Sequence, residues 1–214
     1  GIPTLYIDLD GVILDFFRYF CHVFRIKINE RGFMHEHVTA YGYSTDKKLR
    51  AFLNKTIANQ TTDYWFNMPY TQLGHLLWDS LKYHRPYIFY NNLENDPGME
   101  IGRLKQIRRR LKFRYYQKYM SKELSPMYSD LNRLIINQDK AKYARNALGV
   151  SNILIDDSVL ACDAWEEAGG KAFLYIDSLM VVERIISQVK IDMDKTCNLD
   201  FLLQWDQKLQ KYVH

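Results

Sequence analysis

The sequence has few cysteines and no long stretch that is purely apolar. Its 214 residues include three cysteines, Cys21, Cys162 and Cys197, which lie far apart and are odd in number. This usage argues against a disulfide framework and lacks the close spacing of a zinc site, so we expect a reduced, cytoplasmic protein. The apolar run over 16–24 is interrupted by charged and polar residues such as Arg18, which argues against a membrane span.

Internal repeats, low-complexity tracts and a strong excess of one charge are also missing. The net charge is +4, which is compatible with an anionic substrate but does not require one. Strand-like sequence begins almost at the first residue, so we expect no signal peptide. The length suits one domain with a real hydrophobic core and leaves room for a small insertion.

The first feature with chemical content is an apolar segment, residues 5–7, that runs into Asp8 and Asp10. A short apolar run bounded by a turn residue predicts a buried strand, and Gly11 permits the sharp turn that follows. Because strand side chains alternate between faces, the two carboxylates should point the same way. Two such carboxylates normally require a cation or a shifted pKa.

A second apolar segment, residues 152–155, also ends in two acids, Asp156 and Asp157. The chain then continues with a helical stretch, two glycines suited to a helix end, and a further apolar strand, over 161–168, 169–170 and 172–175. Two strands that end in acids, in this order, are a far more specific signal than either one alone.

The rest of the chain alternates between helical and strand-like patterns. Apolar residues at helical spacing predict helices over 14–28, 49–58, 73–82, 99–124 and 181–189, and from about Lys140 to Gly149. Further strands are expected over 85–92 and 131–136, and a loop over 30–46. Strands that alternate with helices predict an α/β fold, a Rossmann-like parallel sheet flanked by helices, with its active site at the carboxyl ends of the strands.

Residues 8–12 resemble the first motif of the haloacid dehalogenase-like (HAD) phosphatases, Asp-x-Asp-Gly-Val/Thr. Asp156 and Asp157 resemble the fourth motif of that family, an apolar strand followed by two aspartates. The third motif is a lysine that opens the helix before the fourth motif. Lys140 is well placed for it, with Lys142 as the alternative.

The resemblance implies a Mg²⁺-dependent phosphatase that forms an aspartyl-phosphate. Asp8 would attack the phosphorus, and Asp10 would protonate the leaving oxygen and then activate water. Lys140 would neutralise the charge on nucleophile and phosphate. Asp8, the Asp10 carbonyl and Asp156 would hold the Mg²⁺, while Asp157 would order a metal-bound water or support Lys140. Oxygen ligands of this kind suit Mg²⁺.

One motif departs from the family. The strand over 85–92 takes the place of the second motif, where the family has a serine or threonine that donates a hydrogen bond to the phosphoryl group. This chain has Tyr90 or Asn91 there. A tyrosine hydroxyl or an asparagine amide can also donate, so phosphate binding could survive the change.

The resemblance also implies a helical cap inserted after the first strand. We expect a core over 1–14 and 83–214 and a cap over 15–82, of about the size found in the 5'(3')-deoxyribonucleotidase-like branch. Substrate choice would then lie in the cap. The aromatic candidates for stacking on a base are Phe16, Phe17, Tyr64, Trp65 and Phe66.

Several functions remain compatible with these residues. A 5'-nucleotidase acting on (deoxy)nucleoside monophosphates is the first. A phosphatase of polynucleotide ends would use the basic helix at 103–118, although a solvated helix face explains that charge more simply. A sugar-phosphate mutase needs the same aspartates. A non-catalytic HAD-like binding module has only the altered second motif in its favour. The tail after residue 190 could pack on the core or contact a second subunit, so the oligomeric state is open and a dimer is one option.

Overall fold

The structure is a computed structural model that describes residues 1–23, 55–56, 59–90, 133–136 and 139–210. The chain forms two compact units. The first consists of residues 1–8, 72–89 and 138–214, and the second of residues 9–71 and 90–137. The predicted division into a core and a cap stays a prediction.

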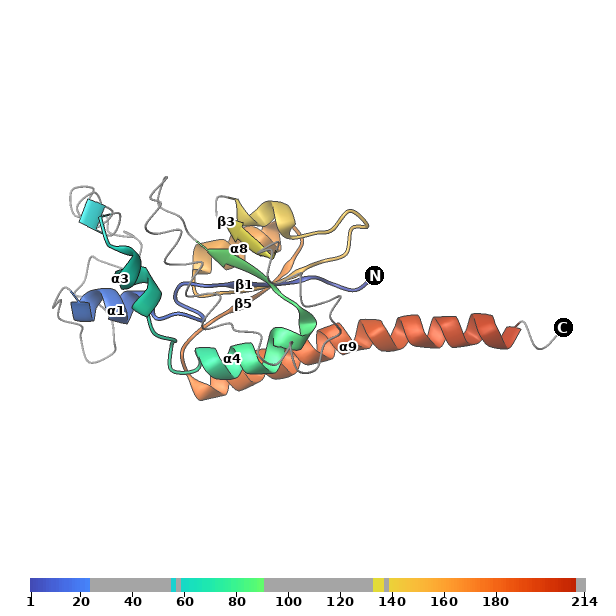
Figure 1. The fold of residues 1–214 in the computed structure, drawn as a ribbon. Helices are drawn as coiled ribbons and strands as arrows, with labels where there is room; N and C mark the ends of the chain where they lie inside the picture. The colour runs from blue at the N-terminus through green and yellow to red at the C-terminus, as the bar shows by residue number, and fades with distance from the viewer. Residues whose placement is uncertain (24–54, 57–58, 91–132, 137–138, 211–214) are drawn as a thin grey trace. The chain divides into compact units, whose positions relative to one another are not determined.

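The described elements alternate between strands and helices along most of the chain (Figure 1). The strands are β1 (Leu5–Asp8), β2 (Tyr87–Tyr90), β3 (Leu134–Ile136), β4 (Ile153–Asp156) and β5 (Lys171–Leu174). The α-helices are α1 (Phe16–Val23), α3 (Thr62–Asn67), α4 (Gly74–Leu81), α8 (Val159–Glu167) and α9 (Leu179–Gln210). Two short 3₁₀ helices are η2 (Lys82–His84) and η3 (Lys140–Tyr143). None of the described helices is both long and apolar enough to span a membrane.

The strands form a five-stranded sheet in the order β3-β2-β1-β4-β5. The pairings of β1 with β2, of β1 with β4 and of β4 with β5 are all parallel. This architecture confirms the predicted α/β fold, a Rossmann-like parallel sheet flanked by helices.

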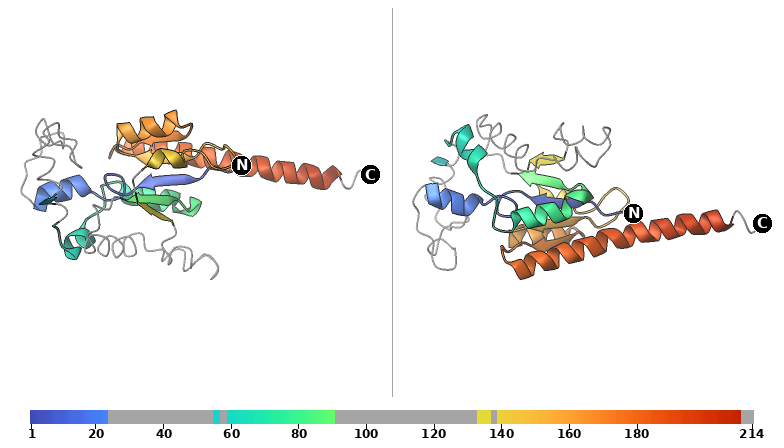
Figure 2. Two further views of the ribbon diagram at one scale, coloured as in Figure 1. Left: turned by 90° about the horizontal axis from the view of Figure 1, so that it is seen from above. Right: turned by 60° about the horizontal axis from the view of Figure 1, so that its bottom comes forward.

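The two faces of the sheet are covered by different helices. Tyr6 on β1 contacts the ring of Trp165 on α8, so even-numbered positions of β1 face α8. Lys171 at the start of β5 pairs with Asp192 of α9, which places α9 on the opposite face. Helix α4 runs beside α9 in both views (Figure 2). Each face therefore has its own helical layer, which explains why β1 and β4 are buried at every position.

Helix α9 is much longer than the predicted helix over 181–189, because it continues without a break to Gln210. In its first half the buried side chains are Val182, Ile185, Ile186, Val189 and Met193. These positions recur every three or four residues and form one stripe toward the sheet. The predicted helix register is therefore correct, and the predicted end is too early.

The helix predicted from Lys140 to Gly149 is wrong in extent, since it is only the single 3₁₀ turn η3. After η3 the Asn146 side-chain oxygen accepts hydrogen bonds from the backbone N–H groups of Leu148 (2.9 Å) and Val150 (3.0 Å). Such side-chain bonds compete with helical ones and favour a turn. Gly149 has a positive φ of 76°, so the sequence identified the stop signal but not how early the helix ends.

In the second unit, aromatic side chains pack the described helices together. The ring of Phe16 stacks on Phe20, with centroids 6.3 Å apart, and on Trp65, at 6.2 Å. The loop after β1 is held by Thr71, whose hydroxyl donates to the Val12 carbonyl at 2.7 Å. Residues 9–14 are therefore held by this unit's own hydrogen bonds and core.

In the first unit, Asp177 fixes the start of α4. Its carboxylate accepts hydrogen bonds from the backbone N–H groups of Gln72 and Leu73, both at 3.0 Å, and from the Tyr175 hydroxyl, at 3.0 Å. The N–H groups before the first turn of a helix have no partner within that helix. A carboxylate from a distant loop supplies that partner here.

Replacement of Asp177 by alanine should lower the free energy of unfolding by about 2–3 kcal/mol, because charge-assisted hydrogen bonds to two backbone N–H groups are lost. Urea denaturation measures this change. Asp163→Ala is the control, since Asp163 lies exposed on α8, and it should change the value by less than about 0.5 kcal/mol. Equal effects of the two substitutions would contradict the role given to Asp177.

Candidate active site

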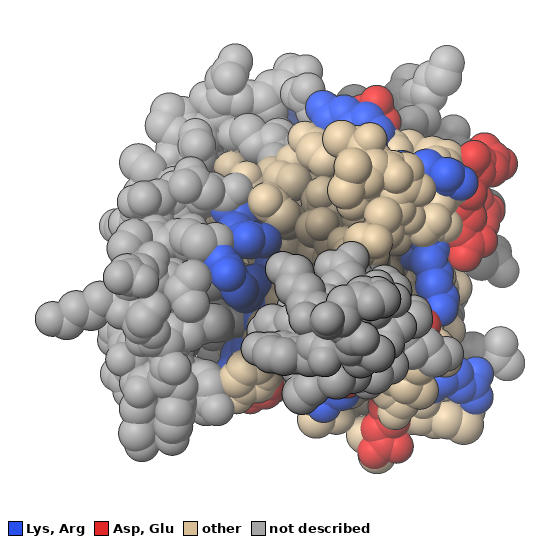
Figure 3. All heavy atoms as spheres, turned by 90° about the vertical axis from the view of Figure 1, so that its right-hand side faces the viewer, with Lys and Arg blue, Asp and Glu red and all other residues tan. Residues whose placement is uncertain are grey.

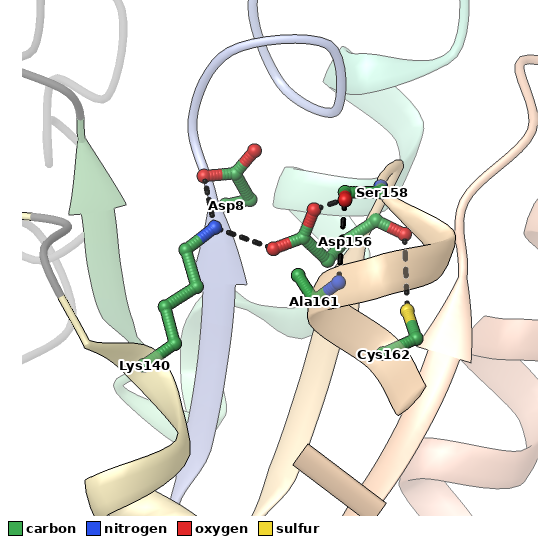
Figure 4. Close-up of polar contacts among 6 residues, drawn as sticks. All are labelled: Asp8, Lys140, Asp156, Ser158, Ala161 and Cys162. Atoms are coloured by element: carbon green, nitrogen blue, oxygen red, sulfur yellow. Dashed lines mark hydrogen bonds and ion pairs between the residues drawn. The ribbon is translucent and has the colours of Figure 1, made fainter. Parts of the chain in front are cut away.

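Two carboxylates meet at the carboxyl edge of the sheet. Asp8 is the last residue of β1, and Asp156 is the last residue of the adjacent parallel strand β4. Leu154 pairs with Tyr6 in the register of these strands, and each aspartate lies two residues farther along. Both carboxylates therefore lie on the face of the sheet that α8 covers, as Figure 4 shows.

Lys140 places its ammonium group between these carboxylates (Figure 4). The Nζ atom donates to Asp8 Oδ1 at 3.0 Å and to Asp156 Oδ2 at 2.5 Å. The Lys140 side chain is only 9% exposed and that of Asp156 only 1%. The structure thus brings Lys140 to Asp8, which is 132 positions away in sequence, and to Asp156, which is 16 positions away. The alternative lysine, Lys142, is exposed on η3.

The charge of Lys140 is stabilised by its surroundings. Burial by itself would lower the pKa of this ammonium group, but Asp8 and Asp156 outweigh burial and raise the pKa above its ordinary value. Lys140 is therefore cationic at any physiological pH. A fixed positive charge beside Asp8 is what an anionic substrate needs to approach a carboxylate.

The start of α8 orients Asp156. The Ser158 backbone N–H donates to Asp156 Oδ1 at 2.9 Å, and the Ser158 hydroxyl accepts a hydrogen bond from the Ala161 N–H at 3.2 Å. Ser158 is thus the N-cap of α8, and it also holds the carboxylate. This role of Ser158 was not predicted, although a serine at the start of a helical stretch is a recognisable cap signal.

Cys162 lies one turn into α8, with its Sγ 3.7 Å from the carbonyl oxygen of Asp156. Burial, together with the negative charge of Asp156, raises the pKa of this thiol to about 12. The thiol is therefore protonated and is not a nucleophile at neutral pH. It contributes to packing beneath the strand end (Figure 4).

The carboxylates of Asp8, Asp156 and Asp157 could hold a divalent cation. One oxygen of each lies within 4.8 Å of the others. Hard oxygen donors of this kind fit Mg²⁺, which takes a few carboxylates and fills its remaining positions with water and substrate oxygens. The predicted ligand from Asp10 is a backbone carbonyl, and its part in such a site stays a prediction.

The surroundings of the Asp157 carboxyl group would favour a bound cation. Although the residue as a whole is exposed, protein atoms crowd its carboxyl group. This burial, together with the charge of Asp156, raises the pKa of Asp157, while Lys140 opposes the rise. A bound divalent cation would favour the ionised form, so the residues present fit the metal that the motifs imply.

Asp10 follows in the second unit and is 1% exposed. It lies in a tight turn in which the Gly11 N–H donates to the Leu14 carbonyl at 2.8 Å. Gly11 has a φ of 83°, which confirms the predicted sharp turn. The acid–base role of Asp10 stays a prediction.

The predicted substrate-binding residues differ in their surroundings. Phe16 and Trp65 are 2% and 0% exposed, so a base could stack on either ring only after a neighbouring group moved. Phe66 is partly exposed, and Tyr90 ends β2 in a buried position. Asn91 lies outside the described residues. Substrate binding by these residues stays a prediction.

The basic helix expected at 103–118 also lies outside the described residues. On the face drawn in Figure 3, the described Lys and Arg side chains are interspersed with Asp and Glu. A polynucleotide substrate stays a prediction.

Searches with models of known protein families and against curated protein sequences found no match. Among solved structures, the chain is similar to a phosphonoacetaldehyde hydrolase-like protein from Oleispira antarctica, with 12% identity and a TM-score of 0.37, over 80% of this chain and 71% of that one. It is also similar to a HAD family enzyme from Bacteroides thetaiotaomicron in a magnesium complex, with 17% identity and a TM-score of 0.34, over 83% of this chain and 95% of that one. Likenesses this weak decide neither activity nor substrate.

Replacement of Lys140 by methionine should lower the free energy of unfolding by about 3–5 kcal/mol, because it leaves two buried carboxylates without their cation. Lys142→Met removes an exposed charge from the same turn and should cost little. Since the pKa of Lys140 is raised in the folded state, its contribution is fully present below the ordinary value of 10.5 and is lost only as pH rises through the raised value. Denaturant titrations at neutral and mildly alkaline pH should therefore give the same difference.

Mg²⁺ provides a second measurement on the same variant. If the carboxylates form a cation site, Mg²⁺ should raise the melting temperature of Lys140→Met, since the metal replaces the missing positive charge. No rise at millimolar Mg²⁺, with the variant folded, would contradict the site.

Proposed function

We propose that this protein is a Mg²⁺-dependent phosphatase of the HAD type, which hydrolyses phosphate monoesters through an aspartyl-phosphate. We further propose that its substrates are (deoxy)nucleoside monophosphates. The observation that carries the proposal is the buried ammonium of Lys140 between Asp8 and Asp156 at adjacent strand ends. These are the residues to which the motif resemblance assigns the nucleophile, the lysine and a metal ligand.

In the proposed reaction, the Asp8 carboxylate attacks the phosphorus of a phosphate group that is itself negatively charged. Lys140 lowers the repulsion between Asp8 and an incoming phosphate, and it would stabilise charge on the phosphoryl oxygens as the leaving bond breaks. An ammonium has three N–H donors, and two of them donate to Asp8 and Asp156 in the structure. The third is the one that a phosphate oxygen would take.

Asp8, Asp156 and Asp157 would hold the Mg²⁺, which supplies further positive charge at the phosphate when bound. Ser158 keeps Asp156 in place through its backbone N–H. Asp10 would supply the proton to the leaving oxygen and later accept one from the attacking water. These roles rest on the motif resemblance together with the observed cluster.

Phosphate release from a panel of compounds tests the proposal. The panel holds nucleoside monophosphates, sugar phosphates and oligonucleotides phosphorylated at the 3' or 5' end, each assayed with Mg²⁺ and with EDTA. We expect turnover of the mononucleotides that requires Mg²⁺. Asp8→Asn should lower kcat by at least about a thousandfold, because it removes the nucleophile while keeping the side-chain shape.

Asp163→Asn is the matched control, since it removes a carboxylate from the exposed side of α8, and it should keep the parental activity. Turnover of sugar phosphates alone, or of oligonucleotides alone, would contradict the proposal that the substrates are nucleoside monophosphates, and the compounds that are turned over would take their place. A folded protein that releases phosphate from nothing in the panel would overturn the phosphatase, and a binding module would take its place.

A further inference from the structure

Five aromatic rings form a cluster on the α8 face of the sheet, below the site. Tyr6 lies at its centre, with ring centroids 5.3 Å from Tyr87, 5.2 Å from Phe89, 5.7 Å from Tyr143 and 5.3 Å from Trp165. Phe89 closes the cluster through contacts with Tyr143 at 5.6 Å and Trp165 at 6.2 Å. Edge-on and tilted pairs of this kind add stability beyond the area that they bury.

Three of the five rings lie on elements that carry or hold a site residue. Tyr6 precedes Asp8 by two positions on β1, and Tyr143 ends the 3₁₀ turn that Lys140 begins. Trp165 belongs to α8, whose N-cap holds Asp156. The cluster thus joins the three elements that must meet for the site to form.

Phe89 contacts the site itself. The Lys140 Nζ atom lies over its ring, 5.4 Å from the centroid. The ring has no exposed surface, and Phe89 is the direct neighbour of Asp8 in the β1–β2 register. A cation over an aromatic face is attracted by the ring quadrupole, and more strongly where water is excluded.

We propose that Phe89 is a positioning residue for Lys140. The ring gives the ammonium a third contact, in addition to Asp8 and Asp156, and fixes the direction in which the remaining N–H points. A third carboxylate in this place would also hold the lysine, but it would add a further negative charge where a phosphate has to bind. An aromatic ring holds the cation without adding any charge. The mechanistic part of this role rests on the proposed phosphatase function, whereas the contact does not.

The first test measures the contact without any assay of activity. Unfolding free energies are compared for Phe89→Leu, Lys140→Met and the double variant. We expect Phe89→Leu to change the unfolding constant by about 3- to 30-fold more when Lys140 is present than when it is methionine, in the range of a buried cation–π pair. Tyr87→Leu is the matched control, since it removes a ring that stacks on the same Tyr6 from the same face of β2, two positions earlier.

Tyr87→Leu should change the unfolding constant equally in both backgrounds. If Phe89→Leu does so too, Phe89 does not position Lys140 and the proposal fails, whether or not the protein is a phosphatase. NMR gives a second readout on folded protein. The ammonium protons of Lys140 should lose their ring-current shift in Phe89→Leu and keep it in Tyr87→Leu.

The second test asks what the contact does in turnover. Phe89→Leu should lower kcat about tenfold with a smaller change in KM. The reason is that the Lys140 ammonium is held less firmly in the transition state of the variant than in that of the wild-type protein. Phe89→Tyr, which keeps the ring, should restore most of kcat, and Tyr87→Leu should leave kcat near the parental value. Equal losses of kcat in Phe89→Leu and Tyr87→Leu would mean that Phe89 acts only through packing, and this result would overturn its role in positioning Lys140 for turnover. An inactive wild-type protein would count against the proposed function and leave the first test unaffected.

Discussion

The ammonium of Lys140 between two buried carboxylates is the interaction on which the site depends. Asp8 and Asp156 end adjacent parallel strands on one face, so without a cation between them their charges would repel in a poorly hydrated place. The same ammonium group would, under the proposed function, lie beside the phosphate of a bound substrate.

Other contacts in the first unit hold the elements that carry these three residues in place. The aromatic cluster packs β1, β2, η3 and α8 against one another, and Ser158 couples the start of α8 to the Asp156 carboxylate. Asn152, just before β4, accepts from the Thr4 N–H at 2.9 Å and donates to the Tyr143 carbonyl at 2.8 Å. These contacts tie together β1, η3 and β4, the elements that carry Asp8, Lys140 and Asp156.

Much of the fold could be predicted because its signals are local. Apolar runs that end in aspartate predicted β1 and β4, and the glycine pair predicted the end of α8, where Gly169 has a φ of 88°. The helix predicted up to Gly149 failed because Asn146 closes a turn with its own side chain, which apolar spacing does not reveal. The full length of α9 was missed because the apolar pattern continues into a tail with no stop signal.

The sequence by itself determined the fold class and the types of chemical group present, because strand and helix periodicity and the order of acidic strand ends are properties of neighbouring residues. The sequence favoured Lys140 over Lys142, but only the tertiary structure decided that Lys140 reaches the carboxylates, because that depends on which way a 3₁₀ turn directs its side chain. It also decided that Phe89 lies under that lysine. No local pattern encodes this contact, because it depends on the register of β2 against β1 and on the packing of η3 over both.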